Sequence, residues 1–321
     1  MKAIVYDRYG SFEVLSLCDI AQPTIERDEV LVRVHAAGLH IGDCFGVHGA
    51  PFAMRAVSGF LRPKYGVPGF DLAGTVEAIG PDVTSCKPGD EVFGAGFGTC
   101  AEYARVKQAT LAPKPRSLSF AQAAAIPTSG LAALAAIRDT AKLQAGRKLL
   151  VNGAAGGVGL FAVQIAKSLG AHGTGVCSSK SVELVRKSGA DHAIDYASQD
   201  FTQGPARYEV ILDNIENRSL SDIRRVLTPK GMLILNSGTG ATGLAMMVRL
   251  LRPLVLNLFV SQHLRRFLSK PNRADLLTLA ELADAGQLTP ILDQTFPLSE
   301  TRATLAHVES GLAHGKAVVT L

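Results

Sequence analysis

The pattern of apolar and polar residues changes character along the chain. The first part favours short strands separated by turns rich in glycine and proline. Val30–Val34 is a β-branched apolar run, Leu72–Ile79 is a second strand-like run, and Lys87–Asp90 is a Lys-Pro-Gly-Asp turn signal. Because long helical periods are scarce here, this part predicts a mainly β domain with irregular loops.

A different pattern begins at Ser119, which forms a capping box with Gln122 at the start of an Ala-rich helix. Strand-like and helix-like runs then alternate. The expected strands are Lys148–Asn152, His172–Cys177, Glu209–Asp213 and Met232–Asn236, and the expected helices are Val158–Leu169, Ser181–Ser188 and Leu220–Leu227. This alternation predicts a parallel sheet with helices on both faces, and hence an α/β fold class.

The C-terminal part predicts a helix over Ala274–Ala285 that ends at Gly286, a strand near Gln294, a helix over Ser299–Gly311 and a strand over Ala317–Leu321. We expect this tail to return to the N-terminal domain. A length of 321 residues exceeds what one core usually organises, so two domains are expected. Their predicted bounds are 1–118 completed by 270–321, and 119–269.

Composition and charge narrow the function classes. The formal charge is +5, but Lys and Arg are spread along the chain, which makes no case for a nucleic-acid partner. The five cysteines lack C-x-x-C spacing, which disfavours a disulfide framework or a four-cysteine metal site and is typical of the cytoplasm. No signal peptide is recognised at the N-terminus.

One apolar run, Gly243–Phe259, is interrupted by Arg249, Arg252 and Pro253, so it cannot span a membrane. It could form a wall or lid over a substrate, belong to the core, or touch a membrane surface. If the run belongs to the core, it is a helix followed by the last strand of the sheet, Val255–Val260, which could also pair across a dimer.

The clearest chemical signal is the run Asn152–Gly159, with the sequence Asn-Gly-Ala-Ala-Gly-Gly-Val-Gly, between an apolar strand and a helix. A tight turn needs residues without Cβ, and N–H groups at a helix N-terminus bind pyrophosphate. Gly153, Gly156 and Gly157 would permit the turn and the close approach, and Gly159 would let the helix pack. A glycine turn without a ligand is the alternative, but the βαβ context favours a dinucleotide.

The residues after the next strand indicate which dinucleotide binds. An NAD site usually carries an acid at this point. Here Cys177 is followed by Ser178, Ser179 and Lys180, whose hydroxyls and cation suit a 2′-phosphate. The sequence therefore predicts NADPH. Arg186 is either a second cation for the phosphate or an ordinary solvated charge.

Several motifs in a fixed order resemble those of the medium-chain dehydrogenase/reductase superfamily, specifically its zinc-free quinone oxidoreductase branch. The motifs are Met1–Val5, Gly69–Val76, Lys87–Val92, Gly153–Gly159, Gly189–Asp191, Ile194–Tyr196 and Gly315–Lys316. The resemblance covers nearly the whole chain. It implies a GroES-like, mainly β catalytic domain and a Rossmann domain with a doubly wound parallel sheet, with the active site in the cleft between them.

The resemblance also implies which residues touch the cofactor. It implies that Ala155, Gly157 and Val158 contact the pyrophosphate, that Ser178 and Tyr196 contact the ribose phosphate, and that Thr128 lies near the nicotinamide. Ser237 belongs to the loop expected on the nicotinamide side.

Metal ligands separate the branches of this superfamily. Where zinc-containing relatives carry a cysteine and a Gly-His-Glu segment, this chain has His40 with Asp43, and Gly69-Phe70-Asp71. Phe70 cannot bind a metal, and His40 beside Asp43 does not make the usual three-ligand site. We therefore predict no zinc. Without that Lewis acid, the expected acceptor is already electrophilic, such as a quinone or an α,β-unsaturated carbonyl.

Zinc-free relatives usually have asparagine at the position of His40. His40 could donate a proton to the enolate or hydroquinone oxygen, or it could be hydrogen-bonded to the cofactor or simply packed. Asp43 is expected to orient its neighbours, and Tyr65 is a weaker donor candidate. The sequence thus predicts an NADPH-dependent oxidoreductase that forms a homodimer. The alternative is an NADPH-binding structural or RNA-associated protein with little turnover.

Overall fold

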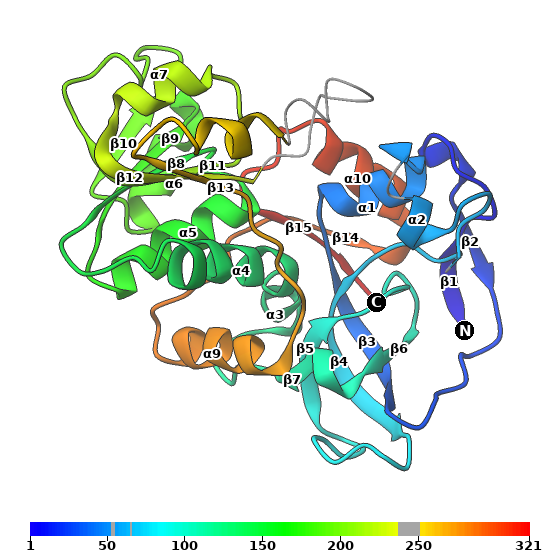
Figure 1. Ribbon diagram of the computed structural model, residues 1–321. Helices are drawn as coiled ribbons and strands as arrows, with labels where there is room; N and C mark the ends of the chain where they lie inside the picture. Colours follow the sequence, from blue (N-terminus) through cyan, green and yellow to red (C-terminus); the bar gives the residue numbers. More distant parts are fainter. Residues whose placement is uncertain (53–54, 65, 237–250) are drawn as a thin grey trace. The chain divides into compact units, whose positions relative to one another are not determined.

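The computed structural model describes residues 1–52, 55–64, 66–236 and 251–321, which form two compact units (Figure 1). The first unit comprises residues 1–131 and 270–321, and the second comprises residues 132–269. The first division falls after residue 131, whereas the sequence predicts it after residue 118. The reason is that the helix over Phe120–Ala124 packs on the sheet of the first unit, where the Ala124 carbonyl lies against Gly38.

The first unit is built on a seven-stranded sheet in the order β14-β15-β3-β4-β5-β7, with β6 paired to β3. Its strands are β3 (Glu29–Leu39), β4 (Asp71–Ile79), β5 (Glu91–Ala95), β6 (Tyr103–Lys107), β7 (Leu111–Pro113), β14 (Leu292–Pro297) and β15 (Lys316–Thr320). A separate hairpin joins β1 (Lys2–Val5) to β2 (Ser16–Asp19). The return of the tail is confirmed, because β15 pairs with β3 and places Ala317 opposite Leu39.

Short helices cover this unit. They are α1 (Ile41–His48), α2 (Arg55–Ser58), α3 (Phe120–Ala124), α4 (Pro127–Leu134, which crosses the division), α9 (Arg273–Asp284) and α10 (Thr301–Glu309), with single turns η1 (Phe12–Val14), η3 (Gln108–Thr110) and η6 (Leu298–Glu300). The predicted capping box is present, since the Ser119 hydroxyl accepts from the Gln122 N–H and the Gln122 side chain accepts from the Ser119 N–H. The stop at Gly286 is also present, with a φ of 69°.

The second unit contains six parallel strands in the order β10-β9-β8-β11-β12-β13. They are β8 (Lys148–Asn152), β9 (His172–Cys177), β10 (His192–Asp195), β11 (Tyr208–Asp213), β12 (Leu227–Leu235) and β13 (His263–Arg265). Numbered from β8, this is the order 3-2-1-4-5-6 of a doubly wound dinucleotide-binding sheet. The chain reverses its direction of winding between β8 and β11, which is where such sheets bind their ligands.

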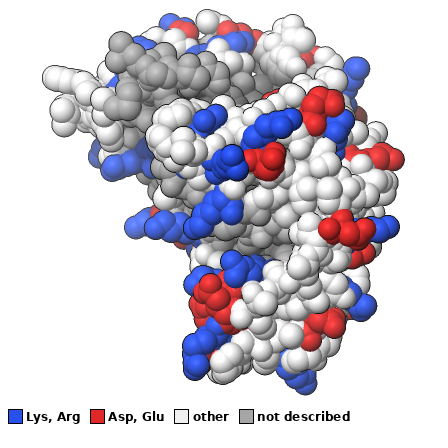
Figure 2. All heavy atoms as spheres, turned by 90° about the vertical axis from the view of Figure 1, so that its right-hand side faces the viewer, with Lys and Arg blue, Asp and Glu red and all other residues white. Residues whose placement is uncertain are grey.

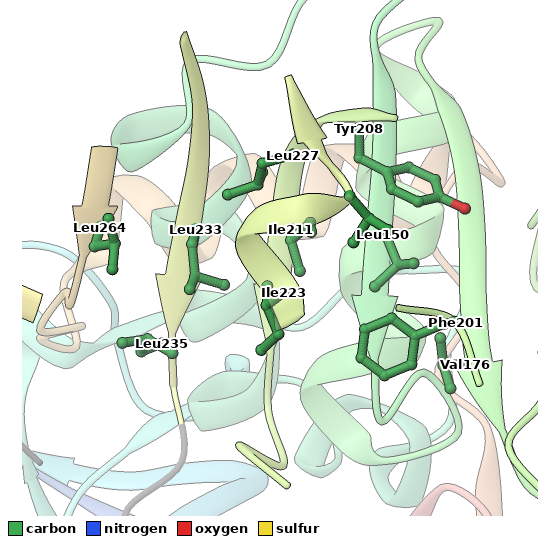
Figure 3. Packing of buried hydrophobic residues seen from close by; sticks show 11 residues of the cluster. Leu150, Val176, Phe201, Tyr208, Ile211, Ile223, Leu227, Leu233, Leu235 and Leu264 are labelled. Atoms are coloured by element: carbon green, nitrogen blue, oxygen red, sulfur yellow. The ribbon is translucent and has the colours of Figure 1, made fainter. Parts of the chain in front are cut away.

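Helices pack on this sheet. They are the π-helical turn η4 (Ala135–Thr140), α5 (Gly157–Ser168), η5 (Ser179–Ser181), α6 (Val182–Lys187) and α7 (Leu220–Arg225). Figure 3 shows the core on one face, where Ile223 of α7 packs over Ile211 and Leu233 of neighbouring strands. Ile211 and Leu233 are fully buried, so the β-branched and leucine runs of these strands account for the sheet.

The predicted strand over Val255–Val260 is wrong. Residues 251–256 are helical and 257–259 form a turn, in which the Leu258 N–H donates to the Val255 carbonyl at 3.1 Å. The β-branched ends suggested a strand, but the apolar residues recur at helical spacing. The sixth strand is instead β13, whose Leu264 is buried against the sheet.

Charge and hydropathy add two observations. On the face shown in Figure 2, acidic and basic side chains both occur among uncharged areas. Among the helices of the described residues, none is long and apolar enough to cross a membrane.

Candidate functional site

The glycine-rich turn between β8 and α5 has the geometry that a bound pyrophosphate requires. Gly153 takes a φ of 78°, in the left-handed region that favours glycine. The N–H groups of Gly153 and Ala154 both donate to the Val176 carbonyl of β9, at 3.1 and 2.9 Å. These bonds fix the turn to the sheet at the carboxyl ends of β8 and β9.

The start of α5 is left open by the protein. Gly156 is the N-cap residue and provides no side-chain hydrogen bond to the first turn. The N–H groups of that turn therefore lack a capping acceptor, and together with the helix dipole they favour an anion. Ala155, Gly157 and Val158 lie at this point of the chain, and their contacts with a pyrophosphate stay a prediction.

The fold restricts two glycines of this turn to different degrees. A Cβ at Gly159 would overlap the Gly153 carbonyl oxygen and lie 2.7 Å from Ala154 Cα, so the fold itself requires glycine there. A Cβ at Gly156 would meet only the Gly153 oxygen, at 3.6 Å, which is an ordinary contact. Gly156 is exposed and the fold itself does not require glycine there; we call the uncapped start of α5 beside it the cradle.

The residues predicted to bind the 2′-phosphate follow β9 and β10, which are neighbours in the sheet. Ser178 and Lys180 come after β9, and Tyr196 comes after β10, with its N–H bonded to the Cys177 carbonyl at 3.1 Å. Lys180 is exposed and Tyr196 is 55% exposed, so both are available to a ligand. Arg186 instead forms an exposed ion pair with Glu183 at 3.0 Å, as an ordinary solvated charge does.

A carboxylate lies beside the residues predicted to bind the phosphate, because β10 pairs with β9 and places Asp195 opposite Cys177. The Ser179 hydroxyl donates to Asp195 Oδ2 at 2.6 Å. This hydrogen bond, with a second from the Ala197 N–H, lowers the pKa of Asp195, which is therefore ionised near neutral pH. Ser179 already donates its proton to Asp195, which leaves Ser178, Lys180 and Tyr196 as the stronger candidates for the phosphate.

In the first unit, His40 caps α1 with its imidazole. The Gly42 N–H donates to His40 Nδ1 at 3.0 Å, and the His40 N–H donates to Asp43 Oδ2 at 2.8 Å. Burial lowers the pKa of His40 to about 4, with Lys316 adding to the shift and Asp71 opposing it. Near neutral pH the ring is therefore uncharged, and because Nδ1 accepts, the proton must be on Nε2.

The Nε2–H group of His40 is buried and has no hydrogen-bond partner among the described residues. A buried donor without a partner costs free energy, and a ligand that accepted from Nε2–H would remove that cost. Phe70 stands beside it, with the two ring centroids 6.4 Å apart in an edge-to-face arrangement. An aromatic ring thus lies near His40 at the position where zinc-containing relatives supply a second ligand.

Asp43 is hydrogen-bonded to the backbone of the residue that carries the imidazole, and its orienting role stays a prediction. Its carboxylate accepts from the His40 backbone and closes the capping box of α1. Burial raises the pKa of Asp43 to about 7, against the hydrogen bond from His40 and the charge of Lys316. Asp43 therefore holds the residue that carries the imidazole rather than offering a group of its own.

A buried ion pair, which the sequence analysis does not predict, lies on the strands next to His40. Lys316 begins β15 and Asp71 begins β4, on either side of β3, and Lys316 Nζ is 4.0 Å from Asp71 Oδ2. Lys316 is 4% exposed and Asp71 is fully buried. Burial lowers the pKa of Lys316 and raises that of Asp71, while their mutual attraction opposes both shifts.

Thr128 is tied to the same pair. Its hydroxyl donates to Asp71 Oδ1 at 2.6 Å, and its N–H donates to both carboxylate oxygens at 3.0 and 3.1 Å. These bonds favour the ionised form of Asp71. Thr128 is thus held by Asp71, and its hydroxyl oxygen remains able to accept a hydrogen bond.

Two predicted residues, Tyr65 and Ser237, lie outside the described residues. Within the described part of the chain, no group of three or more His, Cys, Asp or Glu residues is placed to hold a metal ion. The role of Lys316 and Asp71 was missed because it depends on strand pairing. The one signal in the sequence is a charged residue at the start of an otherwise apolar strand.

Comparisons with known proteins agree with this geometry. Residues 26–116 match the alcohol dehydrogenase GroES-like domain, and residues 188–319 match a family described as zinc-binding dehydrogenase. The mitochondrial NAD(P)H oxidoreductase RTN4IP1 of Mus musculus is 33% identical over 100% of this chain and 89% of its own length. The chloroplastic NADPH-dependent alkenal/one oxidoreductase of Arabidopsis thaliana is 32% identical over 99% of this chain and 79% of its own.

A solved structure, the quinone oxidoreductase from Coxiella burnetii, superposes with a TM-score of 0.87 at 28% identity, covering 100% of this chain and 99% of that one. The two-domain plan and the chemistry of these relatives are those of nicotinamide-dependent oxidoreductases. The chain belongs to the medium-chain dehydrogenase/reductase superfamily, in its quinone oxidoreductase-like branch. The predicted family and the predicted fold class are confirmed.

The two glycines give a paired prediction. We expect Gly156→Val to weaken NADPH binding by about tenfold or more, because the added carbons fill the space beside the open helix end. Its melting temperature should stay close to that of the wild type. Gly159→Ala should instead lower the melting temperature by several degrees, since overpacking costs about 1–3 kcal/mol. Fluorescence titration with NADPH and thermal unfolding measure the two effects, and unchanged NADPH affinity in Gly156→Val would contradict the cradle.

Lys316 gives a second prediction, measured on His40. In the wild type, NMR titration should show the His40 ring neutral from pH 8 to 5, with its midpoint near 4. Because the Lys316 cation lowers the pKa of His40, Lys316→Met should move the midpoint upward, and Lys316→Arg should largely preserve it. A His40 midpoint that is the same in a folded Lys316→Met variant would show that Lys316 does not act on the ring.

Proposed function

We propose that this protein transfers hydride from NADPH to a quinone or an α,β-unsaturated carbonyl compound without a metal ion. The observation that carries the proposal is the glycine turn at the start of α5, which leaves an anion site open at the switch point of the sheet. The names of the relatives, which include an alkenal/one oxidoreductase and a quinone oxidoreductase, support these acceptor classes.

The preference for NADPH rests on the charges after β9 and β10. Lys180 is an exposed cation that makes no ion pair among the described residues, and Ser178 and Tyr196 lie at the same edge of the sheet. A doubly charged phosphate gains from such a cation. The Asp195 carboxylate would repel a phosphate at this edge. Its two oxygens already accept hydrogen bonds from the Ser179 hydroxyl and the Ala197 N–H, which stabilise its negative charge.

His40 is proposed as the group that meets the acceptor oxygen. When bound, NADPH supplies the hydride, and negative charge then develops on the oxygen of the acceptor. The neutral imidazole presents Nε2–H, and an oriented, buried donor stabilises such a charge without reorganisation. One proton per hydride must also reach the product. The neutral imidazole, whose Nδ1 accepts from the Gly42 N–H, acts as a hydrogen-bond donor to the oxyanion, and this proton is taken from water.

The absence of a metal requirement is part of the proposal. Phe70 occupies the neighbourhood of His40 with an aromatic ring, which offers no ligand atom. A carbonyl compound conjugated to C=C, or a quinone, accepts hydride without the polarisation that a simple ketone needs. In the proposed reaction the protein therefore has to position the acceptor against the cofactor and supply one hydrogen-bond donor.

We also propose a homodimer in a reducing compartment such as the cytoplasm. The five cysteines, including the buried Cys44 and Cys100, are unpaired, as is usual where thiols stay reduced. Light scattering on the purified protein tests the dimer.

The test of function is a stopped-flow screen of NADPH oxidation with 9,10-phenanthrenequinone, short enones and alkenals. We expect turnover with at least one of these classes. In His40→Ala, kcat should fall by about 10²-fold or more, because removing one oriented donor to a developing oxyanion has an effect of this size. His40→Gln, which keeps an N–H donor, should recover part of the rate.

Two controls make the screen decisive. His172→Ala removes an exposed histidine of the second unit and should leave the rates unchanged. Replacing NADPH by NADH should lower kcat/KM, and Lys180→Ala should reduce that preference, whereas Lys187→Ala should not. Tight NADPH binding with no oxidation by any acceptor would instead favour the structural or RNA-associated alternative.

A further inference from the structure

The ammonium group of Lys316 is buried without a hydrogen-bond acceptor. Lys316 is 4% exposed, and its Nζ has no hydrogen-bond partner among the residues that the structure describes. Asp71 Oδ2 lies 4.0 Å away, a distance that allows attraction but no hydrogen bond. The Asp71 oxygens instead accept from the N–H and hydroxyl of Thr128. A buried cation without an acceptor costs free energy, and a ligand oxygen bound to Nζ would reduce that cost.

A second buried lysine of the first unit shows how the fold usually satisfies such a group. The Lys114 side chain is 8% exposed, and its Nζ donates to the carbonyls of Pro115 and Leu118 at 3.1 and 2.7 Å. The same atom lies 3.3 Å from Glu91 Oε2. Lys316 is buried to a similar degree but has no such acceptors, which distinguishes it from a lysine that only supports the fold.

The register of the sheet places Lys316 beside His40. β15 pairs antiparallel with β3, with Ala317 opposite Leu39. His40 keeps an extended backbone, with a φ of −147° and a ψ of 170°, so the register continues by one residue and sets Lys316 opposite His40. Side chains that lie opposite each other project from the same face of a sheet. The Lys316 ammonium and the buried Nε2–H of His40 therefore start from neighbouring positions on one face.

Gly38 lies at the centre of this face. It is two residues before His40, and β4 places Asp71 opposite it. A Cβ at Gly38 would overlap the Ala124 carbonyl and lie 3.3 Å from Asp71 Cβ, so the fold excludes a side chain there. An ammonium, a carboxylate and an imidazole thus surround a residue without a side chain. Burial lowers the pKa of Lys316, whereas the Asp71 carboxylate opposes that shift and favours the ammonium.

We propose that the Lys316 ammonium is a further catalytic group, which binds the acceptor oxygen together with His40 Nε2–H. This inference rests on the proposed hydride transfer and adds a cation to the neutral donor named there. When a hydride adds to the β-carbon of an enone, the C=C electron pair moves toward the carbonyl carbon and the C=O pair moves onto oxygen. The nicotinamide is thereby oxidised, the enone becomes an enolate, and water supplies the proton to its α-carbon. A buried cation beside that oxygen stabilises the enolate more than the uncharged enone.

The first test uses 4-nitrophenol, whose coloured phenolate resembles the enolate or hydroquinone anion. The probe is titrated with pH in the presence of the wild-type protein and NADP⁺. We expect the bound probe to ionise at a lower pH than the free probe, because the site favours the anion. In the double variant Lys316→Met, Asp71→Asn the ionisation midpoint should rise by about one pH unit or more, a tenfold loss of preference for the phenolate.

The double variant separates catalysis from the structural role of the ion pair. It leaves no buried charge alone, so its melting temperature should stay close to that of the wild type. Burial still keeps His40 neutral in this variant, because Lys316 and Asp71 shift the pKa of His40 in opposite directions. We expect kcat for enone reduction to fall by about 10²-fold. A lysine that only neutralises Asp71 would predict wild-type kcat and an unchanged midpoint, and that result would overturn the proposal.

The matched control is Lys114→Met, which removes a buried lysine whose hydrogen bonds are complete. This variant should be less stable to heat but should keep the midpoint and kcat of the wild type. A wild-type protein that does not bind the phenolate, or an equal midpoint shift in Lys114→Met, would also contradict the role of Lys316. The titration needs no turnover, so it can fail while hydride transfer is observed, and it can succeed where no acceptor is reduced.

Discussion

The close approach of α5 to the turn that precedes it is the constraint on which the second unit depends. Gly159 leaves no room for a Cβ beside the Gly153 carbonyl, and Gly153 itself lies at a positive φ. Only this pair lets the helix begin directly at the edge of β8. The consequence is chemical, because no side chain caps the N–H groups of the first helical turn, and an uncapped helix N-terminus favours an anion.

The first unit depends on a different balance, that of buried charge. Asp71 and Lys316 are nearly or fully removed from water, and each would be costly alone. The strand order β15-β3-β4 brings them within 4.0 Å, and Thr128 supplies three further contacts to the carboxylate. Burial keeps the neighbouring imidazole neutral by lowering its pKa, and the Lys316 cation adds to this shift while the Asp71 carboxylate opposes it. His40 thus becomes a fixed hydrogen-bond donor instead of an acid that titrates near neutral pH.

Local patterns in the sequence predict much of this fold. The bounds of β8 follow from the apolar run Leu149–Val151, and the start of α3 follows from Ser119 and Gln122. Helix α1 is not predicted, because Gly42 and Gly46 weaken its helical pattern and its stability comes from the His40 cap and the burial of Cys44 and Val47. Contacts between strands are also beyond local patterns.

The same distinction applies to the candidate site. The cofactor turn is a contiguous motif, so its residues can be predicted from the sequence alone. The contact of Ser179 with Asp195 and that of Lys316 with Asp71 join residues far apart in sequence, and only the sheet order reveals them. His40 was recognisable as unusual, but its tautomer depends on the Gly42 N–H, which a sequence does not show.

The central claim is that this chain passes hydride from NADPH to an electrophilic acceptor with no bound metal. The most direct measurement uses NADPH deuterated at C4 of the nicotinamide ring, protein dialysed against EDTA with its zinc content measured, and mass and NMR analysis of the reduced enone. The account predicts deuterium on the β-carbon of the product. It also predicts that dialysis against EDTA does not lower the rate measured with the same cofactor. Product without deuterium from either C4 position, or activity that is lost on dialysis and restored by zinc, would contradict it.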